Sequence, residues 1–227
     1  MSLSLESIRL FHITSITNLD NICKRGSLLS KNLIGNHGIN YQNVAHSGAQ
    51  GSRSKKKVND PPGGVIHDFV PFYFAPRSPM LCAIDRGKVD GCDLTQEDII
   101  YFETTVSKVI NGNEYVFYDC NATLNYSTCY SEVKDLDTII DWNLLTEPPR
   151  LDGYCKYFHN IYEDIRRCDR SAKRHAEFLL KNEVKLSCIN RIGVIDENKK
   201  NQVNGILRSN GLQLQVDIMR DWYFLGQ

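Results

Sequence analysis

Apolar positions along the chain recur mainly at strand spacing, which predicts a core built from short β-strands. The segment 7–14 (SIRLFHIT) has the alternation and β-propensity of a strand, and 65–75 (VIHDFVPFYFA) is a second, aromatic-rich one. Pro71 within it predicts an edge position or a bulge, because proline cannot donate a hydrogen bond to a sheet ladder. Further strands are predicted at 98–106 and 115–118.

Helical spacing is confined to a few segments. Ser15 is a candidate N-cap for a short helix that ends at Gly26. A second helix is expected within 158–181, ending near RSAKRHAEF, and a third over 196–211, closed by Gly211.

The C-terminal region returns to strand-like patterns at 184–195, 212–218 and 221–226. Strands at both ends of the chain, with helices between them, predict an α+β protein rather than repeated βαβ units. Because no internal repeat or linker divides the sequence, we expect a single domain over residues 1–227.

One segment, 30–68, is too polar and glycine-rich for a regular core element. It contains a basic run, RSKKK, at 53–57. Structureless segments longer than about 15 residues are usually functional, so we expect this one to bind a ligand.

Composition is that of an ordinary globular domain. Of 227 residues, 41% are hydrophobic and 24% charged, which excludes disordered and fibrous classes. The 27 basic and 27 acidic residues cancel, so net charge gives no argument for nucleic acid. The positions of the charges do give such an argument, because basic residues gather at 53–57 and 166–174 while acidic residues collect at 85–103 and 132–141.

Cysteine and histidine patterns do not indicate a metal site or a disulfide framework. The eight cysteines contain no CxxC pair, and the six histidines form no HxxxH or HExxH motif. We therefore expect reduced thiols and no metal. No apolar run approaches the roughly 20 residues that span a bilayer, and the N-terminal segment lacks a signal-peptide pattern, so a cytoplasmic protein without a membrane partner is expected.

Two short motifs carry candidate chemistry. His12 and Thr14 lie at i and i+2 on one face of the first strand, where they could hydrogen-bond a ribose and an amide. Glu177 is followed by Phe178, Leu179 and Leu180, and a poorly solvated carboxylate acts strongly on nearby positive charge. Each also has a structural explanation, a half-buried histidine for the first and a helix-surface glutamate paired with a lysine for the second.

Clustered cations give a further candidate. Arg53 and the lysines after it, in a glycine-rich context, could wrap a pyrophosphate or a nucleic-acid backbone, although a solvated loop explains them as well. Arg77 is presented by the Pro-Arg-Ser-Pro turn, where it could equally be a surface charge.

Taken in order, six segments resemble the DarT family of DNA ADP-ribosyltransferase toxins over nearly the whole chain. The most specific are VPFYFAPRSPML and KRHAEFL. The others are RLFHIT, TNLDNICKRGSLL, AHSGAQGSRSKKKV and FYDCNAT.

This resemblance implies an ADP-ribosyltransferase-like split mixed β-sheet with NAD⁺ in the cleft between its halves, as a co-substrate that releases nicotinamide. It implies Arg53 and Glu177 as catalytic residues and a substrate-recognising region at 119–176. The implied NAD⁺ contacts are His12, Ile13, Thr14, Asn21, Leu29 and Arg53. The basic residues expected to bind DNA are Lys55, Lys56, Lys57, Arg77, Arg166, Arg167, Arg170 and Arg174.

The acceptor implied is a base in single-stranded DNA, with thymine N3 as the first choice. Arginine is a poor base because its pKa exceeds about 12, so stabilising the thymine anion is the safer role for Arg53. The resemblance also implies a monomeric toxin with a DarG-type macrodomain antitoxin. The alternatives are a guanine-specific DNA ADP-ribosyltransferase, an RNA 2′-phosphotransferase-like enzyme, and a nucleic-acid-binding module without catalysis.

Overall fold

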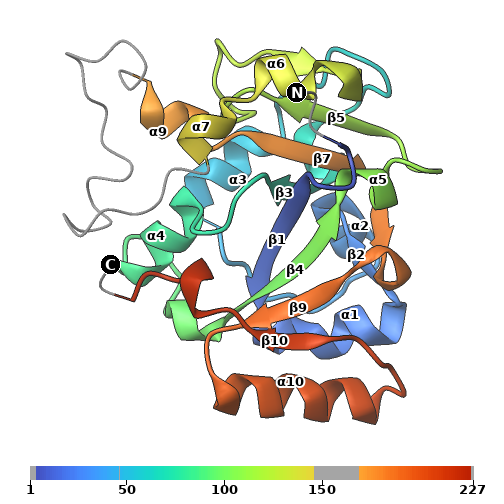
Figure 1. Cartoon of the computed structure of the whole chain (residues 1–227), viewed down its shortest axis with the longest axis vertical. Coiled ribbons are helices and arrows are strands. Elements are labelled where there is room, and N and C mark those ends of the chain that lie inside the picture. Colours follow the sequence, from blue (N-terminus) through green and yellow to red (C-terminus); the bar gives the residue numbers. More distant parts are fainter. Residues whose placement is uncertain (1–3, 46, 146–168, 226–227) are drawn as a thin grey trace.

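A mixed β-sheet that is nearly split in two organises the chain. The computed structural model describes residues 4–45, 47–145 and 169–225 (Figure 1). In these residues eight strands form one sheet in the order β10-β9-β4-β1-β3-β7-β5-β6, and β2 pairs with β8 separately. The pairs are antiparallel except β9 with β10. The strands are β1 Arg9–Ser15, β2 Ser27–Leu29, β3 Phe69–Tyr73, β4 Ile99–Thr105, β5 Tyr115–Tyr118, β6 Cys129–Tyr130, β7 Glu177–Lys181, β8 Glu183–Lys185, β9 Arg191–Val194 and β10 Val216–Ile218.

The split lies between β1 and β3. Whereas β1 pairs with β4 along its whole length, its pairing with β3 is limited to Phe11 opposite Tyr73. The Pro71 carbonyl accepts a hydrogen bond from His12 Nδ1 at 2.8 Å, so the main chain of Pro71 faces the gap between β1 and β3. Among the described residues, no strand pairs with β3 on this side of Pro71, so the missing N–H of proline costs no ladder hydrogen bond. The predicted edge position is wrong, because β3 lies between β1 and β7 in the sheet. The α+β class and the split mixed sheet are confirmed.

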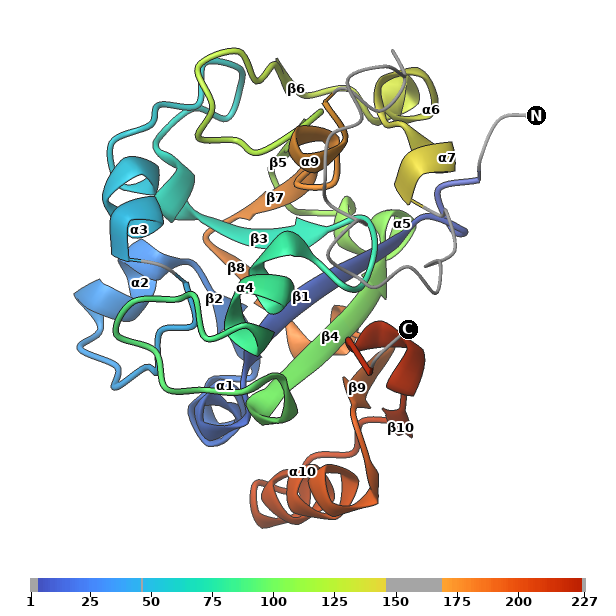
Figure 2. The ribbon, with the colours of Figure 1, turned by 90° about the vertical axis from the view of Figure 1, so that its left-hand side faces the viewer.

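Short helices surround the sheet. In Figure 2, α2 and α3 lie on the same side of the molecule, beside β2 and β3, and α10 lies at the opposite end of the sheet. Figure 1 shows α10 running along β10. The α-helices are α1 Leu19–Arg25, α2 Lys31–Asn36, α3 Ser47–Arg53, α4 Pro79–Asp85, α5 Val106–Val109, α6 Leu136–Ile139, α7 Trp142–Leu145, α9 Arg170–Lys173 and α10 Glu197–Ser209.

Capping residues mark both ends of two predicted helices, α1 and α10. The Ser15 side chain caps a 3-10 turn, Ile16–Asn18, that leads into α1, and Gly26 ends α1 with a left-handed φ of 70°. Asp196 caps α10 through the Lys199 N–H, and Gly211 follows it at φ 68°. The strands at 7–14, 98–106 and 115–118 are also confirmed within a residue or two.

Other predicted elements differ from the structure. Glu177 begins β7 rather than lying in a helix, and only α9 represents the helix expected over 158–181; residues 158–168 lie outside the described residues. Because β7 is buried between β3 and β5, its apolar run has no alternation that distinguishes it from a helix. The segment 30–68 contains α2 and α3, and 184–195 is divided by a 3-10 turn at Leu186–Cys188.

The aromatic residues Trp222 and Tyr223 near the C-terminus are buried in the core, and the strand predicted at 221–226 does not form in the described residues. Trp222 closes a 3-10 turn and lies against Gly193 of β9, where a Cβ would come within 2.3 Å of the indole. Its ring makes an edge contact with Phe11, with ring centres 5.0 Å apart, and the Tyr223 hydroxyl donates to the Ile99 carbonyl at 2.9 Å. Residue 226 lies outside the described residues.

Three further properties follow from the described residues. The cysteines among them, at 23, 82, 92, 120, 129 and 188, are free. In the same residues, no three His, Cys, Asp or Glu side chains gather as metal ligands would. None of the described helices has the length and apolarity to span a membrane.

Candidate active site

A buried ion pair joins two elements far apart in the sequence. Arg53 is the last residue of α3 and Glu177 the first of β7. The guanidinium binds the carboxylate at two points, with Nη1 3.1 Å from Oε1 and Nη2 2.9 Å from Oε2. Their side chains are 13% and 3% exposed. The Ala122 N–H adds a weaker hydrogen bond to Oε1 at 3.3 Å. This two-point geometry fixes the orientation of both groups.

Arg53 keeps its positive charge in this buried site. Burial alone would lower the pKa of Arg53, but the adjacent Glu177 carboxylate more than offsets this and the net shift is upward. Arg53 therefore remains a cation. Burial, and the Glu177 charge beside it, raises the pKa of Tyr73, which lies opposite Glu177 in the sheet register, so its hydroxyl stays neutral.

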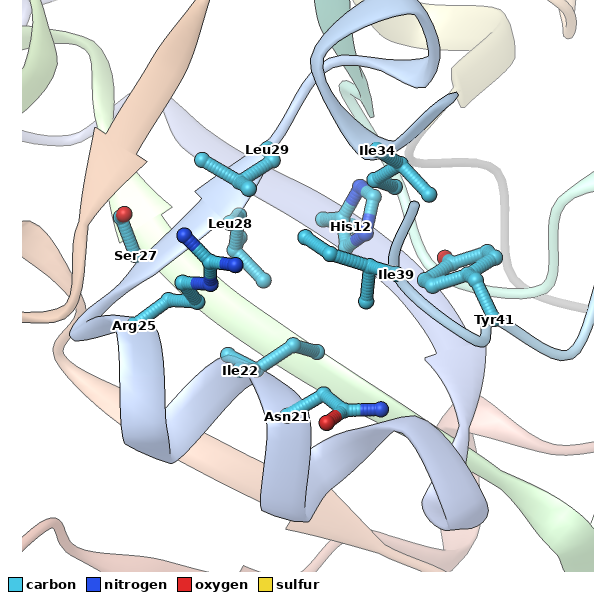
Figure 3. Close-up of a pocket in the computed structure, with 10 residues that line it drawn as sticks. All are labelled: His12, Asn21, Ile22, Arg25, Ser27, Leu28, Leu29, Ile34, Ile39 and Tyr41. Atoms are coloured by element: carbon cyan, nitrogen blue, oxygen red, sulfur yellow. The ribbon is translucent and has the colours of Figure 1, made fainter. Parts of the chain in front are cut away.

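The pair forms part of the wall of a cleft whose empty volume, counting the space open to solvent, is about 720 Å³. His12, Ile13 and Leu29 also line this cavity. A smaller hollow of about 340 Å³ adjoins it and shares four lining residues with it. Figure 3 shows this hollow between α1 and the segment that follows α2. The shared residues are His12, Leu29, Ile34 and Tyr41.

His12 is held as a neutral imidazole. Burial lowers its pKa to about 4, although the hydrogen bond to Pro71 acts in the opposite direction. Because Nδ1 donates to the Pro71 carbonyl, Nε2 keeps its lone pair and can accept a hydrogen bond from a ligand hydroxyl.

The hydroxyl of Thr14 is bonded within the protein. Its hydroxyl bonds Tyr41 at 2.9 Å and accepts from Asn18 at 2.9 Å, so it holds the segment after α2 against β1. Thr14 lines neither hollow. Asn21 does line the smaller one and donates to the Asn40 carbonyl at 2.9 Å.

The expected DNA-binding residues divide into three groups. Lys55 and Lys57 are exposed, and Lys56 donates to the Leu124 carbonyl at 3.0 Å. Arg77 is half-buried in the turn after β3, at a left-handed φ of 54°. Arg170 and Arg174 are buried, and Arg174 donates to the Leu144 carbonyl at 2.7 Å, so these two belong to the packing behind β7 rather than to an exposed basic face. Arg166 and Arg167 lie outside the described residues.

Several site residues had no signal in the sequence. Tyr41 lies in none of the segments that carry the resemblance, and Asn18 and Ala122 lie in two of them without an expected role. Their contacts with Thr14, Gln42 and Glu177 include hydrogen bonds between residues 24 to 55 positions apart, which only the fold reveals. Lys31 and His67 also line the larger cavity without any pattern that marks them.

Comparison with solved structures places this cleft in a known class. The chain resembles the Thermus sp. 2.9 DarT structure in complex with ADP-ribosylated ssDNA, with a TM-score of 0.81 and 30% identity, covering 96% of this chain and 97% of that one. It resembles the same protein in complex with NAD⁺ at a TM-score of 0.81 and 29% identity, covering 96% and 98%. Fold and site together define an NAD-dependent ADP-ribosyltransferase.

Sequence comparison gives the family. The model of the family described as "ssDNA thymidine ADP-ribosyltransferase, DarT" matches residues 11–224. Relatives named DNA ADP-ribosyl transferase include one from Thermus sp. (strain 2.9), 30% identical over 96% of this chain and 97% of its own length. Another, from Thermus aquaticus, is 32% identical over 95% and 88%. The chain belongs to the DarT family of DNA ADP-ribosyltransferases and uses NAD⁺ as its co-substrate.

Proposed function

We propose that the protein transfers ADP-ribose from NAD⁺ to N3 of thymine in single-stranded DNA. The bond between the ribose C1″ and nicotinamide breaks, and its electron pair leaves with nicotinamide. A bond from thymine N3 to the same carbon forms, and the N3 proton passes to solvent. Duplex pairing hides N3, so the substrate is an unpaired base.

The observation that carries this proposal is the two-point contact between Arg53 and Glu177 in the cleft wall. A carboxylate fixed in a poorly solvated site stabilises the oxocarbenium charge that develops at C1″. Arg53, which remains a cation, stabilises the negative charge that develops on thymine as N3 loses its proton. It does not act as the base, because its pKa is raised rather than lowered.

DNA contacts are supported by the surface next to the pair. Lys55 and Lys57 are exposed directly after Arg53. Lys56 ties this segment to the loop that carries Tyr126, whose side chain is 69% exposed. Cations beside an exposed aromatic ring are the features that hold unstacked bases.

An oligonucleotide with one thymine tests the attacking atom. Wild-type protein with NAD⁺ should add one ADP-ribose to it, detected by mass spectrometry. The same oligonucleotide with N3-methylthymine should gain nothing, because the nucleophilic nitrogen is blocked. Modification of the methylated strand, or of a strand whose only candidate base is guanine, would contradict the assignment to thymine N3.

We further propose that the protein acts in the cytoplasm as a monomeric toxin opposed by a DarG-type macrodomain antitoxin. The proposal follows from the chemistry, because an ADP-ribosylated base blocks pairing and a hydrolase that removes it restores the template. Expression should stop DNA synthesis and growth. Co-expression of a macrodomain hydrolase should restore both, and failure of that rescue would contradict the pairing.

A further inference from the structure

A second buried histidine lies in the same cavity as Arg53 and Glu177. His67 belongs to a 3-10 turn, Ile66–Asp68, that leads into β3, and it is only 9% exposed. In the part of the chain that the structure describes, its Nε2 is buried and has no hydrogen-bond partner. Leaving a buried polar atom without a partner is unfavourable. Its place in the wall of a ligand cavity indicates that the ligand supplies the partner.

Two cations lie near this imidazole. Lys31 of α2 and Arg53 of α3 line the cavity with His67, and the Lys31 ammonium lies 5.2 Å from the centre of the Tyr41 ring. Burial is the largest effect that lowers the pKa of His67, and Arg53 and then Lys31 lower it further, while Asp68 opposes them. The empty cavity therefore holds His67 neutral and surrounds it with positive potential.

The charge balance of the lining points to an anion. Among the residues that the structure describes, its charged side chains are Lys31, Arg53 and Glu177, and the last two neutralise each other. One positive charge is left, whereas the diphosphate carries two negative charges; the positive charge of NAD⁺ itself belongs to the nicotinamide ring and is absent from ADP-ribose. One proton on His67 would complete the match.

We propose that Lys31 and His67 bind the diphosphate of NAD⁺, and that His67 takes up a proton from solvent as the anion enters and donates it in a hydrogen bond from Nε2. This inference rests on NAD⁺ occupying the cavity and adds the residues that recognise its diphosphate. His12 cannot serve in this way, because its Nδ1 is already bonded to Pro71 and its pKa is about 4.

Calorimetry of ADP-ribose binding tests the proposal without catalysis. ADP-ribose contains the diphosphate but not nicotinamide, and the diphosphate does not titrate near neutral pH. Binding heats measured at pH 7 in two buffers of different ionisation enthalpy count the protons taken up. Wild-type protein should take up a fraction of a proton. Its dissociation constant should rise with pH, by about tenfold for each unit by which the anion raises the pKa of His67.

Substitutions separate the two residues. His67→Gln keeps a hydrogen-bond donor but cannot be protonated, so it should abolish the proton uptake and give an affinity independent of pH from 6 to 8.5. Lys31→Met should weaken binding at every pH. It should also reduce the uptake at pH 7, because without the neighbouring cation His67 is already partly protonated before binding. Lys108→Met, at an exposed position of α5, is the matched control and should change neither.

Adenosine, which lacks phosphate, should bind without proton uptake. Equal uptake by wild type and a folded His67→Gln variant, or no uptake by wild type, would overturn the proposal. Either result would leave the transferase assignment standing if ADP-ribose still appears on DNA. Thermal unfolding of each variant shows whether it is folded.

Discussion

Replacing Glu177 by glutamine removes one negative charge from the cleft with almost no change in side-chain shape. The carboxylate is 3% exposed and binds both Nη atoms of Arg53 at 2.9 and 3.1 Å. An amide can accept only one of these hydrogen bonds and cannot stabilise a cation at C1″ through charge. Loss of a preorganised electrostatic group typically costs about 10²–10³ in kcat. We expect a loss of at least that size in transfer to DNA.

Stability changes as well, and a matched variant separates the two effects. Arg53 is left buried without its counter-charge, which costs about 3–5 kcal/mol. This should lower Tm by about 6–20 °C for a chain of this size. Glu103 of β4 is equally buried, forms ion pairs with Arg9 and Arg191, and lines neither hollow. Glu103→Gln should therefore destabilise the fold by a similar amount.

The assay is the initial rate of ADP-ribose transfer to a thymine oligonucleotide, at a temperature well below both values of Tm. Glu103→Gln should retain most of the wild-type rate, whereas Glu177→Gln should lose it. DNA affinity, measured without NAD⁺, should be unchanged in both variants. A Glu177→Gln rate within threefold of wild type, or equal losses in the two variants, would refute the catalytic role argued for Glu177.

Three further predictions concern the surface, the packing and the pH dependence. Replacing Lys55 and Lys57 together by glutamine should weaken single-stranded DNA binding and lower the slope of log Kd against log salt by about 1.4, measured by fluorescence anisotropy; an unchanged slope would remove them from the interface. Gly193→Ala should destabilise the fold by about 1–3 kcal/mol, because the Cβ of the alanine would overlap the Trp222 ring. A midpoint of urea unfolding equal to that of wild type would show that the indole moves freely. Burial lowers the pKa of His12 from 6.5 to about 4, so between these pH values the unfolded chain binds more protons than the folded one, and the free energy of unfolding falls as pH falls. His12→Gln should remove about 2–3 kcal/mol of the loss in this free energy between pH 7 and 4.5, measured by urea unfolding. An unaltered pH dependence would contradict the low pKa assigned to His12.

The sequence alone predicted those strands and helix ends whose residues follow the usual local preferences for strands and for helix caps. The first strand is rich in residues that favour strands, although both of its faces are buried, and Ser15, Gly26 and Gly211 mark helix ends through side-chain capping and left-handed backbone. The exception is β7. It is buried between two neighbouring strands, so its apolar run lacks alternation, and nothing local shows that Glu177 begins a strand.

The candidate site could be predicted from the sequence only through the resemblance to the DarT family. Arg53 and Glu177 are 124 residues apart, and each alone fits an ordinary surface residue. Their contact depends on the order of strands, which no spacing rule supplies. For Thr14 the sequence motif suggested a ligand contact, whereas in the structure its hydroxyl forms hydrogen bonds with Tyr41 and Asn18. His67 and Lys31 meet in the cavity through α2 and the turn before β3, with no sequence pattern to connect them.

The most direct test of the central claim is the mass of two single-stranded oligonucleotides after incubation with the wild-type protein and NAD⁺. One contains thymine among adenine and cytosine, and the other has the same composition with thymine replaced by guanine. The account predicts a gain of one ADP-ribose on the first strand alone, with release of an equal amount of nicotinamide. A gain on the guanine strand alone, or nicotinamide release with no gain on either strand, would contradict it.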